Sequence, residues 1–174
     1  MSAVLAGGCH YHLEVIDGRE VEKPALKKLH ILIQTYLIIA LNRMLPPRYR
    51  ALPELNVLTG GTSPTGRREY IVPDIQVVER AARYEDGDLA EPPIWGMEIL
   101  SPGQTIGDLF VRSERLLKLG APLTWVIWPE RRKAWMYSPT ELIEAVEELS
   151  AMLADGTEPD SIHVKLAEIW DELD

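Results

Sequence analysis

The sequence has only one cysteine, Cys9, so it cannot form an internal disulfide. Its start lacks the basic stretch followed by an apolar stretch that marks a secretory signal. These two absences predict a cytoplasmic protein. Long apolar runs are also missing. The most apolar one, residues 29–41, is too short to span a bilayer and contains Gln34 and Thr35, so no membrane role is predicted.

Positive charge is scarce too. The chain has 18 Lys and Arg against 27 Asp and Glu, a formal net charge of −9 at pH 7. A protein that coats nucleic acid needs a clustered positive surface, so this balance excludes that class and confines any contact with a polyanion to local sites. Basic residues do cluster at Arg48 and Arg50, at Arg67 and Arg68, and at residues 131–133.

What is present is the composition of an ordinary globular protein. Of the 174 residues, 46% are hydrophobic and 26% are charged, far from the signature of disorder. No internal repeat or low-complexity segment interrupts the chain. Because the length suits one unit with a sizeable core, we expect a single domain over residues 1–174.

Local patterns predict a mixed α/β fold that begins with a β-hairpin. Asp17-Gly18 separates two alternating runs, which is the strongest local signal for a two-residue hairpin turn. Apolar periodicity and the positions of proline and glycine predict the other elements. Helices are expected at residues 24–45, 105–120 and 139–153 and strands at residues 70–79, 94–100, 123–128, 133–138 and 161–166, with a short strand and loop at 52–70, a polar connection at 80–93 and a helical turn at 167–174.

Two acids stand inside strand-like runs. Asp74 follows Pro73 in "VPDIQVVER", and Glu98 lies within "IWGMEILSP". Side chains alternate along a strand, so Asp74 shares a face with Gln76, and Glu98 shares one with Gly96. If the strands are neighbours, the carboxylates converge in a partly buried pocket, where each raises the pKa of the other unless a cation holds them. Mg²⁺, or Mn²⁺ in its place, is the natural cation for such a pair.

Three stretches together resemble a known family. "VPD" at 72–74, "MEILSP" at 97–102 and "GAPLTWVIWPERRKAWMY" at 120–137 are similar to the Uma-two type of putative restriction endonuclease, in the PD-(D/E)XK nuclease superfamily. The resemblance runs from residue 14 to residue 174, nearly the whole chain. It implies a restriction-endonuclease-like fold, with a central mixed β-sheet flanked by helices, and metal-dependent hydrolysis of nucleic acid.

The resemblance also implies roles for single residues. Asp74 and Glu98 match the two acids that bind the metal in this family. His30 falls where the family tends to place a histidine on the first helix, without a clear role. The lysine of the superfamily normally follows the second acid by two residues, where this sequence has Leu100.

In the family, that lysine has moved to the following helix, in a pattern of Asp, Lys four residues on, and Tyr four further. Aligned on "GAPLTW", these positions are Asp108, Arg112 and Leu116. Residues spaced by four share a helical face, so Arg112 can project into the site beside Asp108. Arginine binds phosphate firmly but stays protonated, so it cannot act as a base. The arginine at 112 and the leucine at 116 should therefore impair turnover more than they impair metal or phosphate binding.

Each candidate also has a structural explanation. An acid after proline, such as Asp74, is typical of a turn, and Asp108 fits a capping box with the threonine three residues before it. Arg112 has the neighbours of a solvated, ion-paired surface residue. His30 stands among apolar residues, as hydrogen-bonded core histidines do. Gln104, in the loop after Glu98, either touches the nucleic acid or is simply a polar loop residue.

Three hypotheses follow. The first is a metal-dependent endonuclease acting on DNA, with Asp74 and Glu98 on Mg²⁺ or Mn²⁺, Arg112 on the scissile phosphate and a metal-bound water as nucleophile. The second is a nuclease fold without turnover that persists as a binding or assembly module, for example a homodimer formed through the tryptophan-rich hairpin at residues 123–138. In the third, the acids are purely structural.

Overall fold

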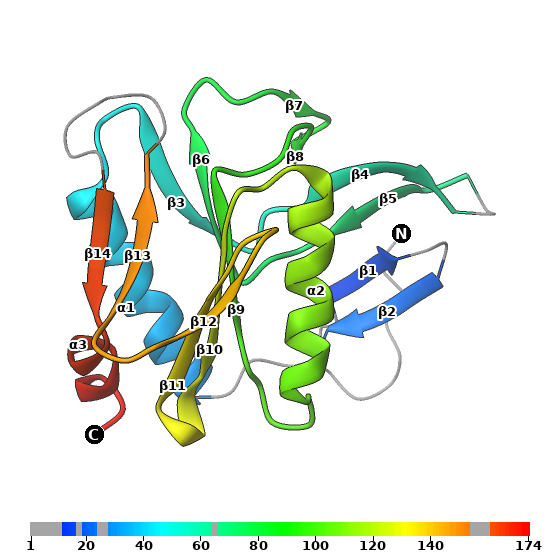
Figure 1. The fold of residues 1–174 in the computed structure, drawn as a ribbon. Coiled ribbons are helices and arrows are strands. Elements are labelled where there is room, and N and C mark those ends of the chain that lie inside the picture. Colours follow the sequence, from blue (N-terminus) through cyan, green and yellow to red (C-terminus); the bar gives the residue numbers. More distant parts are fainter. Residues whose placement is uncertain (1–11, 17–18, 24–27, 64–65, 154–160) are drawn as a thin grey trace.

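The computed structural model describes residues 12–16, 19–23, 28–63, 66–153 and 161–174. Within these ranges the chain forms two six-stranded sheets, a two-stranded sheet and three α-helices (Figure 1). The helices are α1 (Lys28–Met44), α2 (Ile106–Leu119) and α3 (Leu166–Asp171). The fold is therefore mixed α/β, as predicted.

The central sheet carries the rest of the fold. Its strand order is β12 (Leu142–Ala145), β11 (Lys133–Tyr137), β10 (Thr124–Trp128), β9 (Trp95–Ile99), β6 (Ile75–Glu79), β3 (Tyr49–Pro53). The sheet is mixed: β9 and β10 run parallel, and the other neighbours are antiparallel. Parallel neighbours need a crossover connection, and α2 provides it between β9 and β10.

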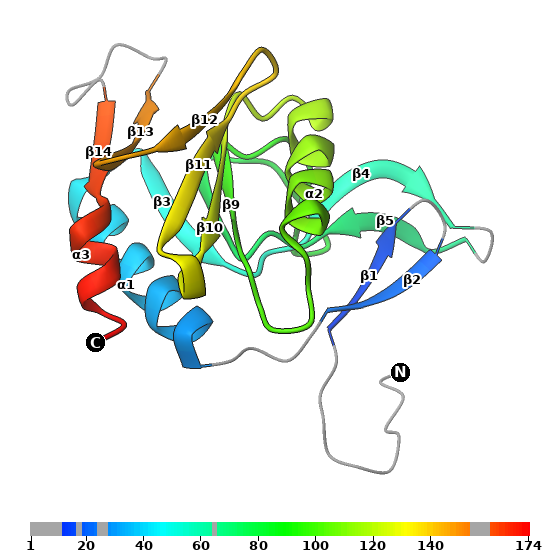
Figure 2. The same ribbon diagram turned by 60° about the horizontal axis from the view of Figure 1, so that its bottom comes forward.

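Two smaller sheets complete the molecule. One has the order β2 (Arg19–Lys23), β1 (His12–Ile16), β5 (Arg68–Ile71), β4 (Val57–Thr62), β8 (Asp88–Leu89), β7 (Tyr84–Glu85). The other pairs β13 (Glu148–Met152) with β14 (Ser161–Lys165). Figures 1 and 2 show α1, α3, β13 and β14 on one side of the central sheet and α2 with the first smaller sheet on the other.

Each face of the central sheet has its own core. Alternate residues of a strand point to opposite faces, so Val77 joins the large cluster on the α1 side while Val78 joins a smaller cluster that includes Leu116 of α2. The large cluster also contains Trp95 and Trp125, whose ring centroids lie 5.9 Å apart. The strands β6 and β9 are buried along most of their length, because helices or strands cover both faces.

Most of the predicted elements are confirmed. The N-terminal hairpin forms from β1 and β2, although its turn at residues 17–18 lies outside the described residues. The first two helices, the hairpin of β10 and β11, the strand β14 and the final helix α3 are also confirmed. The second helix starts at the N-cap Thr105 and ends at Gly120, whose φ of 111° is the left-handed conformation that glycine tolerates.

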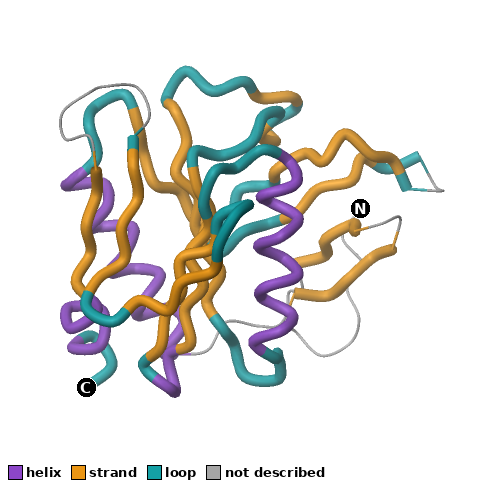
Figure 3. Tube along the Cα trace, viewed as in Figure 1, coloured by secondary structure: helices purple, strands orange, loops and turns teal. Residues whose placement is uncertain are grey.

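The helix predicted for residues 139–153 is wrong, because this segment forms β12 and β13 (Figure 3). Leu149, Ala151 and Leu153 are buried, whereas Glu148 and Met152 are exposed, which is the two-residue period of a strand. The acidic residues spread along the segment produce a sequence pattern that also fits an amphipathic helix. The polar connection at residues 80–93 likewise contains the short pair β7 and β8.

Candidate active site

The two predicted acids lie at one end of the β6–β9 ladder. In this antiparallel pair Ile75 lies opposite Met97, and Gln76 lies opposite Gly96. Asp74 directly precedes Ile75 and Glu98 directly follows Met97, so the two acids lie at the same end of this ladder. Only 2% of Asp74 and 3% of Glu98 is exposed. Two acids at the same end of neighbouring strands are therefore shielded from bulk water.

Glu98 lies on the face of the sheet that α2 covers. A Cβ added to Gly96 would lie 2.7 Å from Cδ1 of Leu116, so the helix packs directly on the strand at this point. Gly96 and Gln76 share this face with Glu98 by strand alternation. Because glycine has no side chain, it leaves room for the helix to approach the acid pair.

Asp74 is held by residues of β9, α1 and the loop after β3. Its carboxylate Oδ2 accepts a hydrogen bond of 2.7 Å from the backbone N–H of Ile99 on β9. Its backbone oxygen accepts bonds from the side-chain amide of Gln34 on α1, at 2.8 Å, and from the N–H of Glu54, at 3.3 Å. The chain turns out of the ladder at Pro73-Asp74, and these bonds fix where the carboxylate then lies.

His30 reaches Asp74 from α1. Its Nε2 lies 3.6 Å from Oδ1 of Asp74, and its Nδ1 lies 3.0 Å from the hydroxyl oxygen of Ser101. His30 and Ser101 are both almost fully buried. Sequence reasoning named His30 but not Ser101, although Ser101 belongs to the "MEILSP" stretch. The imidazole of His30 therefore lies between the first acid and Ser101.

Arg112 of α2 provides the positive charge. Its Nε donates a hydrogen bond of 2.9 Å to Oε2 of Glu98, and its NH2 donates one of 2.8 Å to the backbone oxygen of Val72. The side chains of Arg112 and Glu98 are 14% and 4% exposed. The interpretation of Arg112 as a solvated surface residue is therefore wrong. It forms a partly buried ion pair with the second acid.

A family model described as a putative restriction endonuclease, named Uma2, matches residues 8–165. The chain belongs to the Uma2 family. It is also similar to the crystal structure of a putative nuclease from Anabaena variabilis, with 26% sequence identity and a TM-score of 0.74 over 92% of this chain and 90% of that one. No functionally curated protein matches it. Among the described residues, no helix is long and apolar enough to cross a membrane.

In this Uma2 chain, leucines stand where the resemblance leads us to expect the superfamily's lysine, at residue 100, and the family's tyrosine, at residue 116. Leu100 follows Glu98 by two residues and is half-buried. Leu116 is fully buried and packs over Gly96. Both positions are apolar, so the cation observed at the second acid is the guanidinium of Arg112.

The acid pair suits a divalent ion even though few ligand side chains gather there. Among the described residues, no group of three or more His, Cys, Asp and Glu is placed to hold a metal. Mg²⁺ needs only one or two carboxylates, since water and phosphate oxygens fill its other positions. Beside the pair, Gln76 is fully buried, and neither atom of its amide is hydrogen-bonded to any described residue. A buried amide of this kind usually meets water or a ligand, so polar groups beside the acids are available to a hydrated ion.

Asp108 and Gln104 lie at the start of α2, near its first turn. Asp108 Oδ2 accepts hydrogen bonds from the N–H and the hydroxyl of Thr105, each 2.8 Å long, and the N–H of Asp108 donates back to that hydroxyl. This is the capping box that the sequence predicts. The backbone and side-chain bonds from Thr105 lower the pKa of Asp108 below its ordinary value. Gln104 Oε1 accepts a hydrogen bond of 3.0 Å from the N–H of Ser101, so it closes the loop after β9.

Proposed function

We propose that this chain is a divalent-metal-dependent endonuclease that hydrolyses phosphodiester bonds in DNA. The proposal is supported by the burial of Asp74 and Glu98 at one end of the β6–β9 ladder and by the ion pair of Arg112 with Glu98. Membership of a family of putative restriction endonucleases supports nuclease chemistry. Metal dependence, DNA as the substrate and the residue roles below are our inference.

Asp74 and Glu98 would hold the ion, Mg²⁺ or Mn²⁺. When bound, such an ion polarises a phosphodiester oxygen and acidifies a coordinated water. The chain's own groups prepare the site for it. The N–H of Ile99 fixes one oxygen of Asp74, and His30 with Ser101 restrains that carboxylate from the side of α1.

Arg112 binds the scissile phosphate in this proposal. Its guanidinium is planar and always charged, so it can hold phosphate oxygens and offset the negative charge that grows on them in the transition state. It cannot remove a proton from the attacking water. Asp108 positions Arg112, because its capping box fixes the first turn of α2 one turn before that residue. Gln104 contributes to nucleic-acid binding from the adjoining loop.

A second candidate function is favoured by the departures at Leu100, Arg112 and Leu116: a nuclease fold that binds nucleic acid without cutting it. Self-association through the tryptophan-rich hairpin receives no support from its packing. Trp125 is fully buried, and Trp135 packs edge-on against Phe110 of α2 at 5.7 Å. These two rings are used within the chain.

The test compares the wild-type protein with Asp74→Asn and Glu98→Gln on plasmid and single-stranded DNA in Mg²⁺ or Mn²⁺. Both variants keep the side-chain shape and remove a negative charge, so cleavage should fall below detection while the exposed control Asp171→Asn cuts normally. The proposal is contradicted if the wild type still cuts in chelator, or if Asp74→Asn and Glu98→Gln cut DNA as well as the wild type does. Retention of DNA without any cleavage by the wild type favours the second candidate.

A further inference from the structure

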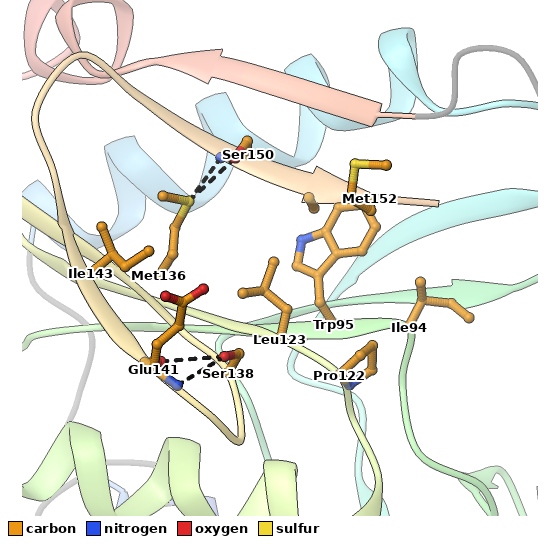
Figure 4. A pocket seen from close by; sticks show the side chains of 11 residues that line it. Ile94, Trp95, Pro122, Leu123, Met136, Ser138, Glu141, Ile143, Ser150 and Met152 are labelled. Carbon is orange, nitrogen blue, oxygen red and sulfur yellow. Dashed lines mark hydrogen bonds between the residues drawn. The ribbon is translucent and has the colours of Figure 1, made fainter. Parts of the chain in front are cut away.

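A second cavity lies away from the acid pair. It has a volume of about 320 Å³ and opens between β11, β12 and β13, at the end of β9 opposite Glu98 (Figure 4). Trp95 and Glu98 are an odd number of residues apart on β9, so they point to opposite faces of the central sheet. The cavity is therefore separated from the proposed nuclease site by the sheet itself.

The walls of this cavity are mostly apolar and thioether groups. Leu123, Met136, Ile143 and Met152 line it together with the indole of Trp95. Ile143 and Met152 remain 42% and 69% exposed at its mouth. Trp95 is 1% exposed, and its indole N–H has no hydrogen-bond partner among the described residues. The size and lining match those of sites for small organic molecules, which combine apolar walls with a few polar groups.

The charged group of the cavity is the carboxylate of Glu141. In Figure 4 it points inward, across Leu123 from Trp95. A tight turn holds this residue, because its backbone N–H donates to the hydroxyl of Ser138 at 3.2 Å. Within the described part of the chain the carboxylate has no ion-pair partner, whereas the nearby Glu144 is bonded to Lys133 at 2.8 Å.

We propose that this cavity binds a small primary amine that carries one aromatic or branched aliphatic group. The ammonium lies against Glu141, and the apolar body lies against Trp95, Leu123 and Met152. A carboxylate at one end and an indole at the other select a molecule that is cationic at one end and apolar at the other. The site is independent of the acid pair, so the amine proposal and the nuclease proposal can be tested separately.

The experiment follows the indole N–H resonance of Trp95 in two-dimensional ¹H–¹⁵N spectra, assigned with Trp95→Phe. The protein is titrated with 2-phenylethylammonium chloride, and with 2-phenylethanol and 3-phenylpropanoate as neutral and anionic analogues of similar shape. For a ligand of this size, saturation at about millimolar concentration is expected. The amine should bind at least fivefold more tightly than the alcohol, and the acid should bind more weakly than both.

Two variants test the placement. Glu141→Gln should reduce amine binding to the level of the alcohol. Ile143→Arg, at the exposed mouth, brings a guanidinium within reach of Glu141 and should abolish binding of the amine, while the other indole resonances report an intact fold. The proposal is overturned if no saturable shift occurs, if the three ligands bind equally, or if Glu141→Gln leaves the amine affinity unchanged. Asp74→Asn should have no effect on this titration.

Discussion

Replacing Arg112 with methionine tests the partly buried ion pair directly. Methionine keeps most of the length of the side chain and removes its charge, so Glu98 is left buried without the guanidinium. Removing one partner of a buried pair costs about 3–5 kcal/mol. Because 14% of the Arg112 side chain is exposed, some water will reach the carboxylate. We therefore expect a loss near the lower end, about 3 kcal/mol of unfolding free energy.

The assay is a double-mutant cycle in urea at neutral pH without added metal. Arg112→Met, Glu98→Gln and the double variant are compared with the wild type, and the coupling energy between the two sites should be about 2 kcal/mol or more. A loss of 3 kcal/mol corresponds to a fall in melting temperature of roughly 6–12 °C for a chain of this size. The matched control is Arg48→Met, whose partner Glu79 forms an exposed pair and whose loss should cost less than about 1 kcal/mol.

Divalent metal adds a second arm to this test. Since Mn²⁺ can replace the positive charge lost from Arg112, the Met variant should gain more stability from Mn²⁺ than the wild type does. A ligand at about 100 times its dissociation constant stabilises a fold by about 2.7 kcal/mol. If the stability losses of Arg112→Met and Glu98→Gln simply add in the double variant, the ion-pair reasoning is refuted. If Mn²⁺ raises the unfolding free energy of both proteins equally, the idea that the guanidinium and the metal interact with the same carboxylate is refuted.

Two further predictions concern the packing and the cap of α2. Gly96→Ala should destabilise the fold by about 1–3 kcal/mol, because its methyl group would lie 2.7 Å from Leu116. Leu116→Ala is itself destabilising, but in urea melts Gly96→Ala should cost less in that background than in the wild type. The pKa of Asp108 is lowered by its bonds with Thr105, so its contribution to stability is present above the ordinary aspartate pKa and is lost as pH falls through the lowered value. The stability gap between wild type and Asp108→Asn should therefore shrink in acid, and a constant gap would contradict this.

The acid pair could be predicted from the sequence because its signals are local. A proline before Asp74, strand alternation around it and a glycine two residues before Glu98 each constrain one strand. The pairing of the two strands needed only that they be neighbours, and the ladder of β6 with β9 provides this. Spacing by four on α2 likewise placed Arg112 on the correct helical face.

What the sequence could not supply were contacts between distant elements. The hydrogen bond between Ser101 and His30 joins residues 71 positions apart, and the one from Arg112 to Val72 joins residues 40 apart. Neither hydrogen bond produces a periodic pattern in the sequence. The error at residues 139–153 has a similar origin, since β12 is set by pairing with β11 and β13 by pairing with β14. Tertiary pairing overrode a local pattern that suited a helix equally well.

The polar groups around the acids bear on how a metal would enter. Buried carboxylates are costly unless cations or N–H donors compensate them. Here the N–H of Ile99 compensates one oxygen of Asp74, and the guanidinium of Arg112 compensates Glu98, so each acid has a partner before any metal arrives. A folded site without metal follows, and chelators should not unfold it. Because a metal on Glu98 competes with the guanidinium for one carboxylate, and a phosphate offers that guanidinium another anion, metal and nucleic acid should each strengthen the binding of the other.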